Sequence, residues 1–124
     1  MKTTSLIARI LLGLLFTVFG LNGFLHFIPT GPMPTGTAGQ FAGALVESHY
    51  MTVVLLLEII PGVLLLVNRY VPLALTVLGP VIVNILLFHA FMAPSGLPLA
   101  FVAVILWILT AYKYLAVFAG LFAR

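Results

Sequence analysis

Four long apolar segments dominate this 124-residue sequence and limit the folds that are open to it. They cover residues 5–28, 51–67, 71–92 and 97–118. Each is close to the roughly 20 residues that a helix needs to cross a bilayer. Stretches rich in proline and glycine separate them, among them PTGPMPTGTAG (29–39) and APSGLP (93–98). We therefore predict an all-α fold, a four-helix bundle integral to a membrane, with residues 1–124 as a single domain.

Composition supports a membrane protein and excludes several classes of function. Hydrophobic residues make up 64% of the chain and charged residues 6%, whereas a soluble domain carries about 25% charged residues. The chain has no cysteine, which excludes disulfides, thiolate metal sites and thiol catalysis within it. Its five scattered cations are too few for a nucleic-acid-binding surface, so we expect the lipid bilayer and no nucleic acid as partner.

The positions of the cations predict how the segments are oriented. They lie near the two termini and between the second and third segments: Lys2, Arg9, Arg69, Lys113 and Arg124. With four spans all five fall on one side, which the positive-inside rule assigns to the cytoplasm. We expect both termini to be cytoplasmic. Because the first segment is long and no A-x-A site follows it, we interpret it as a retained span and not as a cleaved signal.

Two other features concern packing and the outer face. The stretch QFAGALVESHY (40–50) favours a short extracytoplasmic helix between the first two spans, with Phe41 toward lipid, which caps the bundle or lies among the headgroups. Gly13 and Gly20 are one heptad apart and permit close helix approach. Pro61-Gly62 is expected to kink the second span.

Polar residues within the spans predict a site. Asn22 and His26 are four positions apart and would share one helical face. Asn84 and His89 are five positions apart, about 140° around a helix, so they share a face only loosely. Glu58 lies near the centre of the second span, within roughly 5 Å of the midplane at 1.5 Å per residue. Asn84 falls at a similar depth, Asn22 lies higher, and the two histidines lie near the outer boundary. The inner half offers little besides its boundary cations.

These five residues form a series that descends from the outer surface to a buried carboxyl group. Ionisable residues within spans usually face the bundle interior, a partner or water. We therefore predict a shared pocket for ligand binding or proton handling, in which Glu58 is neutral or paired with amide or imidazole donors. The alternative is a structural hydrogen bond between helices, for instance from Asn84 to Glu58.

The histidines leave the cofactor open. His26 and His89 lie at similar depth on two spans, an arrangement that would suit bis-histidine haem ligation. Either could also bind a metal together with Glu47 or His49. Histidines near a membrane boundary more often form hydrogen bonds at the surface, so we expect neither haem nor metal. A quinone remains a candidate ligand, and no catalytic residue is identified.

Three stretches resemble the DoxX-like family of small bacterial membrane proteins: LGLLFTVFGLNGFLHFIP (12–29), LLEIIPGVLLLVNRYVPLAL (56–75) and PVIVNILLFHAFM (80–92). The resemblance covers essentially the whole chain and implies a four-helix bundle in the bacterial cytoplasmic membrane. Through the family's link to an archaeal thiosulfate:quinone oxidoreductase, it implies a redox-associated subunit that binds a quinone or a similar lipophilic ligand. The alternative is a non-enzymatic assembly partner of other membrane proteins, or a homo-oligomer.

Overall fold

The computed structural model describes residues 2–29, 31–32 and 34–123, and this part of the chain contains helices and no strand. The α-helices are α1 (Lys2–Leu25), α2 (Gly36–Glu47), α3 (Tyr50–Leu66), α4 (Val71–Phe91), α5 (Leu97–Ala111) and α6 (Leu115–Ala119). Single turns of 3-10 helix are η1 (Pro94–Gly96), η2 (Tyr112–Tyr114) and η3 (Gly120–Phe122). The all-α prediction is confirmed.

Three helical stretches are long and apolar enough to cross a membrane: Lys2–Leu25, Val71–Phe91 and Pro94–Phe122. Helix α3 has 17 residues. It becomes a fourth candidate span when α2 and α3, which are bent by 86° relative to each other, are counted as one span. The chain therefore has the three to four apolar helices of a membrane protein. Arg124, one of the five cations used for the orientation, lies outside the described residues.

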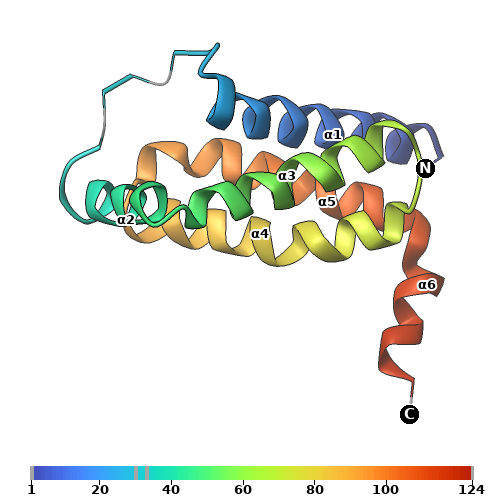
Figure 1. Cartoon of the computed structure of the whole chain (residues 1–124). Helices are drawn as coiled ribbons and strands as arrows, with labels where there is room; N and C mark the ends of the chain where they lie inside the picture. Colours follow the sequence, from blue (N-terminus) through green and yellow to red (C-terminus); the bar gives the residue numbers. More distant parts are fainter. Residues whose placement is uncertain (1, 30, 33, 124) are drawn as a thin grey trace.

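Helices α1, α3, α4 and α5 lie side by side along a common direction (Figure 1). Helix α1 packs against α3 and α5, and α4 packs against the same two helices. The core between them is formed by large apolar side chains, chiefly Leu12, Phe16, Leu65, Leu75, Leu78 and Ile82. Many other large apolar side chains face outward, as expected where lipid is the solvent.

Glycines bring α1 and α3 together, as their spacing predicted. A β-carbon on Gly13 would lie 2.9 Å from the carbonyl oxygen of Gly62, and one on Gly20 would lie 2.6 Å from Cγ1 of Ile59. A β-carbon on Gly62 would in turn lie 2.9 Å from the backbone nitrogen of Thr17. Gly62, which the sequence suggested as part of a kink, thus serves the contact between two helices.

Helix α1 ends at Leu25, three residues before the expected end of the first span. The cause is the side chain of Asn22, which accepts a hydrogen bond from the backbone N–H of Ile28 at 2.7 Å and donates one to its carbonyl at 3.2 Å. His26, between them, adopts a left-handed backbone with φ of 53°. The chain therefore turns back on Asn22 and leaves the helix.

The fourth apolar segment is not one straight helix. Helix α5 ends at Ala111, the turn η2 follows, and α6 then leaves at a steep angle (Figure 1). The expected span over 97–118 therefore breaks at Tyr112–Tyr114. The rings of Trp107 and Phe118 stack with their centroids 6.2 Å apart, a contact that bridges the break.

A short helix follows the first connection, as predicted, and it is α2. Because α2 and α3 are bent by 86°, α2 lies across the end of the neighbouring helices (Figure 1). The ring of Phe41 stacks on Phe88 of α4 with centroids 5.6 Å apart. Phe41 therefore contacts α4 while 43% of its surface stays exposed.

The two ends of the helical assembly differ in charge. Figure 1 places both chain termini and the α3–α4 connection at one end, and α2 with the first connection at the other. The first end carries Lys2, Arg9, Arg69 and Lys113 and is called the basic end below. The end with α2 carries Glu47 and His49 and is called the α2 end.

Candidate functional site

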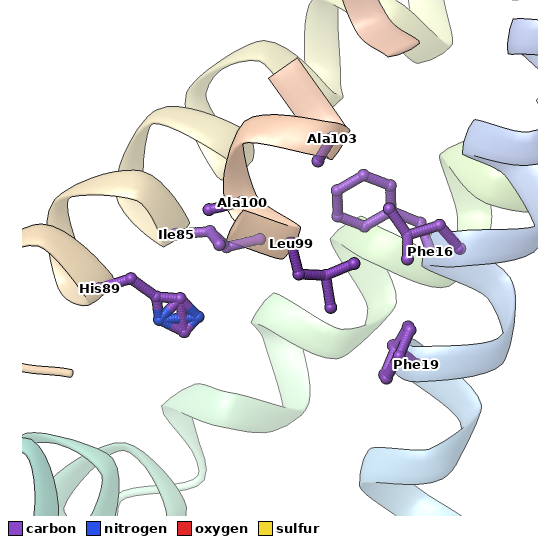
Figure 2. Close-up of a pocket in the computed structure, with 8 residues that line it drawn as sticks. Phe16, Phe19, Ile85, His89, Leu99, Ala100 and Ala103 are labelled. Atoms are coloured by element: carbon purple, nitrogen blue, oxygen red, sulfur yellow. The ribbon is translucent and has the colours of Figure 1, made fainter. Parts of the chain in front are cut away.

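A cavity of about 210 Å³ lies among α1, α4 and α5, toward the α2 end. Eight residues line it: Leu15, Phe16, Phe19, Ile85, His89, Leu99, Ala100 and Ala103. Figure 2 shows His89 and Ile85 on one side and Phe16 and Phe19 on the other, with Leu99 between them. His89 is the one polar side chain among these eight, so the cavity is an apolar chamber with a single imidazole in its wall.

The imidazole of His89 contacts Gly96 closely and also lies near the ring of Phe88. A β-carbon on Gly96 would lie 2.6 Å from Cδ2 of the ring and 2.7 Å from Nε2, so the ring rests on the backbone of η1. The ring of Phe88 lies 5.2 Å away, centroid to centroid. Nδ1 of His89 is buried and has no hydrogen-bond partner among the residues that the structure describes.

Small residues create the space in front of His89. Ala100 and Ala103 of α5 are buried, and their short side chains leave the volume between α5 and α1 unfilled. Phe16, also buried, forms the opposite wall. Phe19 and Leu99 are 43% and 47% exposed, so the cavity reaches the outer surface of the assembly between α1 and α5.

Glu58 lies outside this cavity. It shares a face of α3 with the buried residues Pro61 and Leu65, at helical spacings of three and seven, and its side chain is half-buried. Within the described part of the chain no side-chain hydrogen bond or ion pair to Glu58 is present. This position is consistent with the prediction that Glu58 faces the interior. The amide and imidazole groups that were predicted to be its partners form no hydrogen bond with it among the described residues.

The prediction of one shared pocket is wrong, because only His89 of the five residues lines the cavity. Asn84 is exposed, and its side-chain amide donates to the carbonyl of Pro80 on its own helix at 2.9 Å. Asn22 is buried but caps the end of α1. His26 lies beyond that helix end and is exposed, so it does not share a helical face with Asn22.

The cavity walls could not be read from the sequence. Depth along a span follows from counting residues, but the direction of a side chain around the helix depends on which neighbours pack against it. The 140° between Asn84 and His89 was the one signal that they diverge. In a span where nearly every residue is apolar, no pattern distinguishes a wall such as Phe16 from an outward side chain such as Leu14.

Two buried hydroxyl residues also lie toward the basic end, in the half that was expected to offer little besides its boundary cations. Ser5 and Thr110 are buried there. The hydroxyl of Ser5 donates to the carbonyl of Leu109 at 2.8 Å, and that of Thr110 to the carbonyl of Leu106 at 2.7 Å. The Ser5 bond joins α1 to the end of α5, whereas the Thr110 bond lies within α5.

Over residues 2–29, 31–32 and 34–123, no three histidine or acidic side chains come together in the way that a metal site needs. No protein-family model matches the chain, and comparison with characterised proteins and with solved structures found no significant similarity. The resemblance to the DoxX-like family therefore stays a prediction from the sequence.

Proposed function

We propose that this chain is a small protein of DoxX-like type that spans the membrane four times, with the basic end in the cytoplasm. In this proposal it binds a lipophilic ring compound of the quinone class in the cavity beside His89. One observation carries the proposal: an imidazole lies in the wall of an otherwise apolar cavity, and its buried Nδ1 has no hydrogen-bond partner among the described residues.

The size of the cavity supports a ring as the occupant. At about 210 Å³ it exceeds the roughly 150 Å³ of an engineered apolar cavity that binds benzene. It is smaller than the roughly 300–1,000 Å³ typical of sites for drug-sized ligands. A substituted six-membered ring therefore fits inside, while an isoprenoid tail would leave past Phe19 and Leu99 into the lipid.

The chemistry of the wall supports a ring that carries oxygen. A buried polar group without a partner costs about 1–3 kcal/mol, and a quinone carbonyl or a quinol hydroxyl would offer the imidazole of His89 a hydrogen bond. The apolar residues opposite, Phe16 and Leu99, suit the faces of the ring. The proposal concerns binding, and it assigns no reaction to the chain.

Equilibrium binding of a short-tailed benzoquinone to the purified protein in lipid nanodiscs tests this function. His89→Leu removes the hydrogen-bonding group and is expected to weaken binding by about tenfold. His26→Leu, which changes an exposed histidine outside the cavity, is the matched control and leaves the affinity unchanged. Ala103→Leu fills the cavity and is expected to abolish binding. Equal affinities in wild type and all three variants would contradict the proposal.

A second candidate function, assembly with another membrane protein or with a second copy of the chain, is favoured by Asn84. This amide is exposed about 5 Å from the middle of α4, where lipid would surround it. One of its N–H groups is bonded to Pro80, which leaves an N–H and the oxygen without a partner among the described residues. Amide side chains in spans stabilise helix–helix contacts through such bonds.

Gentle purification tests the assembly role. Asn84→Leu removes the exposed amide, whereas Val83→Leu changes an exposed apolar neighbour on α4 and serves as control. If Asn84 lies in an interface, a stoichiometric partner or a dimer recovered with wild type and with Val83→Leu is lost with Asn84→Leu. Recovery of the same single species from all three proteins would contradict this role.

A further inference from the structure

A second pocket, of about 40 Å³, lies at the basic end, far from the His89 cavity. Seven residues line it: Ser5, Leu6, Arg9, Asn68, Thr110, Lys113 and Tyr114. They come from α1, the α3–α4 connection, α5 and η2. Segments from the beginning, middle and end of the chain thus meet around one small polar space.

Two cations line this pocket, and neither has a carboxylate partner in the part of the chain that the structure describes. Arg9 and Lys113 are 104 positions apart in the chain and are brought together here by the packing of α1 on α5. The chain has two acidic residues in all, Glu47 and Glu58, and neither lines the pocket. No ion pair to Arg9 or Lys113 occurs within residues 2–29, 31–32 and 34–123.

The hydrogen bonds around the pocket leave donors available. Within the described residues the guanidinium of Arg9 donates one bond, to the carbonyl of Leu65, which fixes the side chain and leaves most of its five N–H groups free. Lys113 is exposed with its Nζ 5.8 Å from the ring centroid of Tyr114. The amide of Asn68 makes no side-chain hydrogen bond within the described residues. Cations and N–H donors in this arrangement suit an oxyanion.

We infer that this pocket binds a phosphate group, which Arg9, Lys113 and Asn68 hold by charge and hydrogen bonds. The site is separate from the cavity beside His89, so it stands whether or not a quinone binds there. Phosphate groups reach such a place either in the headgroup of an anionic lipid or as free phosphate. Basic pockets between helices on the cytoplasmic side are typical sites for anionic headgroups.

The surroundings of the pocket match the headgroup region of a bilayer. Helix α6 and the turn η3 leave the assembly here at a steep angle (Figure 1). Their exposed side chains are apolar, among them Leu115, Val117 and Phe122. Tyr70 and Tyr112 are also exposed at this end, and tyrosine is enriched at membrane–water interfaces. A segment of this kind lies along the interface and places Lys113 at the depth of lipid phosphates.

Two double variants test the inference, with equal loss of positive charge. Arg9→Gln with Lys113→Gln removes the two cations that line the pocket. Lys2→Gln with Arg69→Gln removes two exposed cations of the same end that do not line it. Binding of phosphatidylglycerol is measured by native mass spectrometry of protein released from nanodiscs, against phosphatidylcholine as competitor. A parallel titration with inorganic phosphate follows the thermal unfolding of the detergent-solubilised proteins.

The inference predicts that the pocket variant binds phosphatidylglycerol roughly tenfold more weakly than wild type, while the control variant changes by less than twofold. A response to inorganic phosphate alone, lost in the pocket variant, would identify free phosphate as the source. Equal weakening in both double variants would show diffuse attraction to the basic end and would overturn the inference. The inference would also be overturned if wild type bound phosphatidylglycerol no better than phosphatidylcholine and showed no response to inorganic phosphate relative to buffer.

Arg9 also holds the carbonyl of Leu65, so its replacement can affect folding. The single variants Lys113→Gln and Arg69→Gln avoid this difficulty, because both side chains are exposed. Lys113→Gln is expected to weaken phosphatidylglycerol binding severalfold with an unchanged unfolding temperature in phosphatidylcholine. Equal affinities for Lys113→Gln and Arg69→Gln would likewise contradict the site.

Discussion

The imidazole of His89 rests on the backbone of Gly96, so closely that a β-carbon there would lie within 2.7 Å of three ring atoms. Gly96 itself has φ of −89° and ψ of −2°, a conformation that alanine adopts without strain. A methyl group at this position therefore acts through the ring and not through the backbone. Gly96 fixes the direction in which the imidazole faces the cavity.

Gly96→Ala is expected to displace the ring of His89 and to weaken quinone binding about as much as His89→Leu, roughly tenfold. Gly43→Ala is the matched control, because a β-carbon on Gly43 meets no atom within 4 Å. It should leave the affinity unchanged and stabilise α2 by roughly 0.5–1 kcal/mol. Isothermal titration of the nanodisc-embedded proteins measures the first effect, and thermal unfolding measures the second. Wild-type affinity in Gly96→Ala would show that the ring position does not matter.

Glu58 provides a test of stability. Its half-buried carboxyl has no hydrogen bond or ion pair among the described residues, and burying a polar group in this way costs about 1–3 kcal/mol. Glu58→Leu is therefore expected to raise the unfolding temperature, with Glu58→Gln between it and wild type. Glu47→Leu, at the exposed acidic residue, should stay within about 0.5 kcal/mol of wild type.

The same variants separate stability from binding. Because Glu58 does not line the cavity, Glu58→Gln should bind the quinone with an affinity within about twofold of wild type. A lower unfolding temperature for Glu58→Leu would reveal a partner for the carboxyl group. Loss of quinone affinity in Glu58→Gln would restore the original prediction that Glu58 belongs to the ligand site.

The contact between α1 and α3 depends on Gly62. A β-carbon there would lie 2.6 Å from the hydroxyl oxygen of Thr17 and 2.9 Å from its backbone nitrogen, so a larger side chain forces the two helices apart. Gly62→Leu is expected to destabilise the protein by at least the roughly 1–3 kcal/mol that overpacking costs. Thermal unfolding in mild detergent measures the loss, with Gly43→Leu as the control at an open position. Equal unfolding temperatures would mean that α1 and α3 are not in close contact.

Asn22 is predicted to act on the first connection and not on a ligand. Asn22→Ala leaves the N–H of Ile28 without the acceptor that it has at 2.7 Å, at a cost of about 1–3 kcal/mol. Hydrogen–deuterium exchange should then accelerate at the Ile28 amide. Asn84→Ala, at an exposed amide whose one side-chain bond among the described residues is to Pro80 of its own helix, should leave that exchange unchanged. Slow exchange at Ile28 in Asn22→Ala would exclude the capping role.

The sequence was a good guide to helices and a poor one to the site. The lengths of the apolar segments predicted the ends of α1, α3 and α4 to within three residues, because hydropathy determines which segments enter the membrane. The end of α1 could not be predicted, since it depends on the side-chain bonds of Asn22 to Ile28. The break after Ala111 had a signal that the prediction missed, because Lys113 interrupts the apolar run between Tyr112 and Tyr114.

The site residues fall into two groups for a similar reason. His89 was identified because a polar side chain stands out in an apolar span. Gly13 and Gly20 were identified because they are spaced one heptad apart. Asn84 and His26 were conspicuous in the same way, yet one faces outward and the other lies beyond a helix end. The depth of a residue in its span follows from counting along the chain. Whether side chains from different helices meet depends on how the helices pack.

Photo-crosslinking with an azido-substituted short-tailed quinone, mapped by mass spectrometry, tests most directly whether the cavity beside His89 is a quinone site. The account predicts adducts on the cavity walls in α1 and α5, at Phe16, Phe19 or Leu99. It also predicts their loss with excess unlabelled quinone and in Ala103→Leu. Adducts spread evenly over the outward side chains of all helices, unchanged in Ala103→Leu, would contradict it.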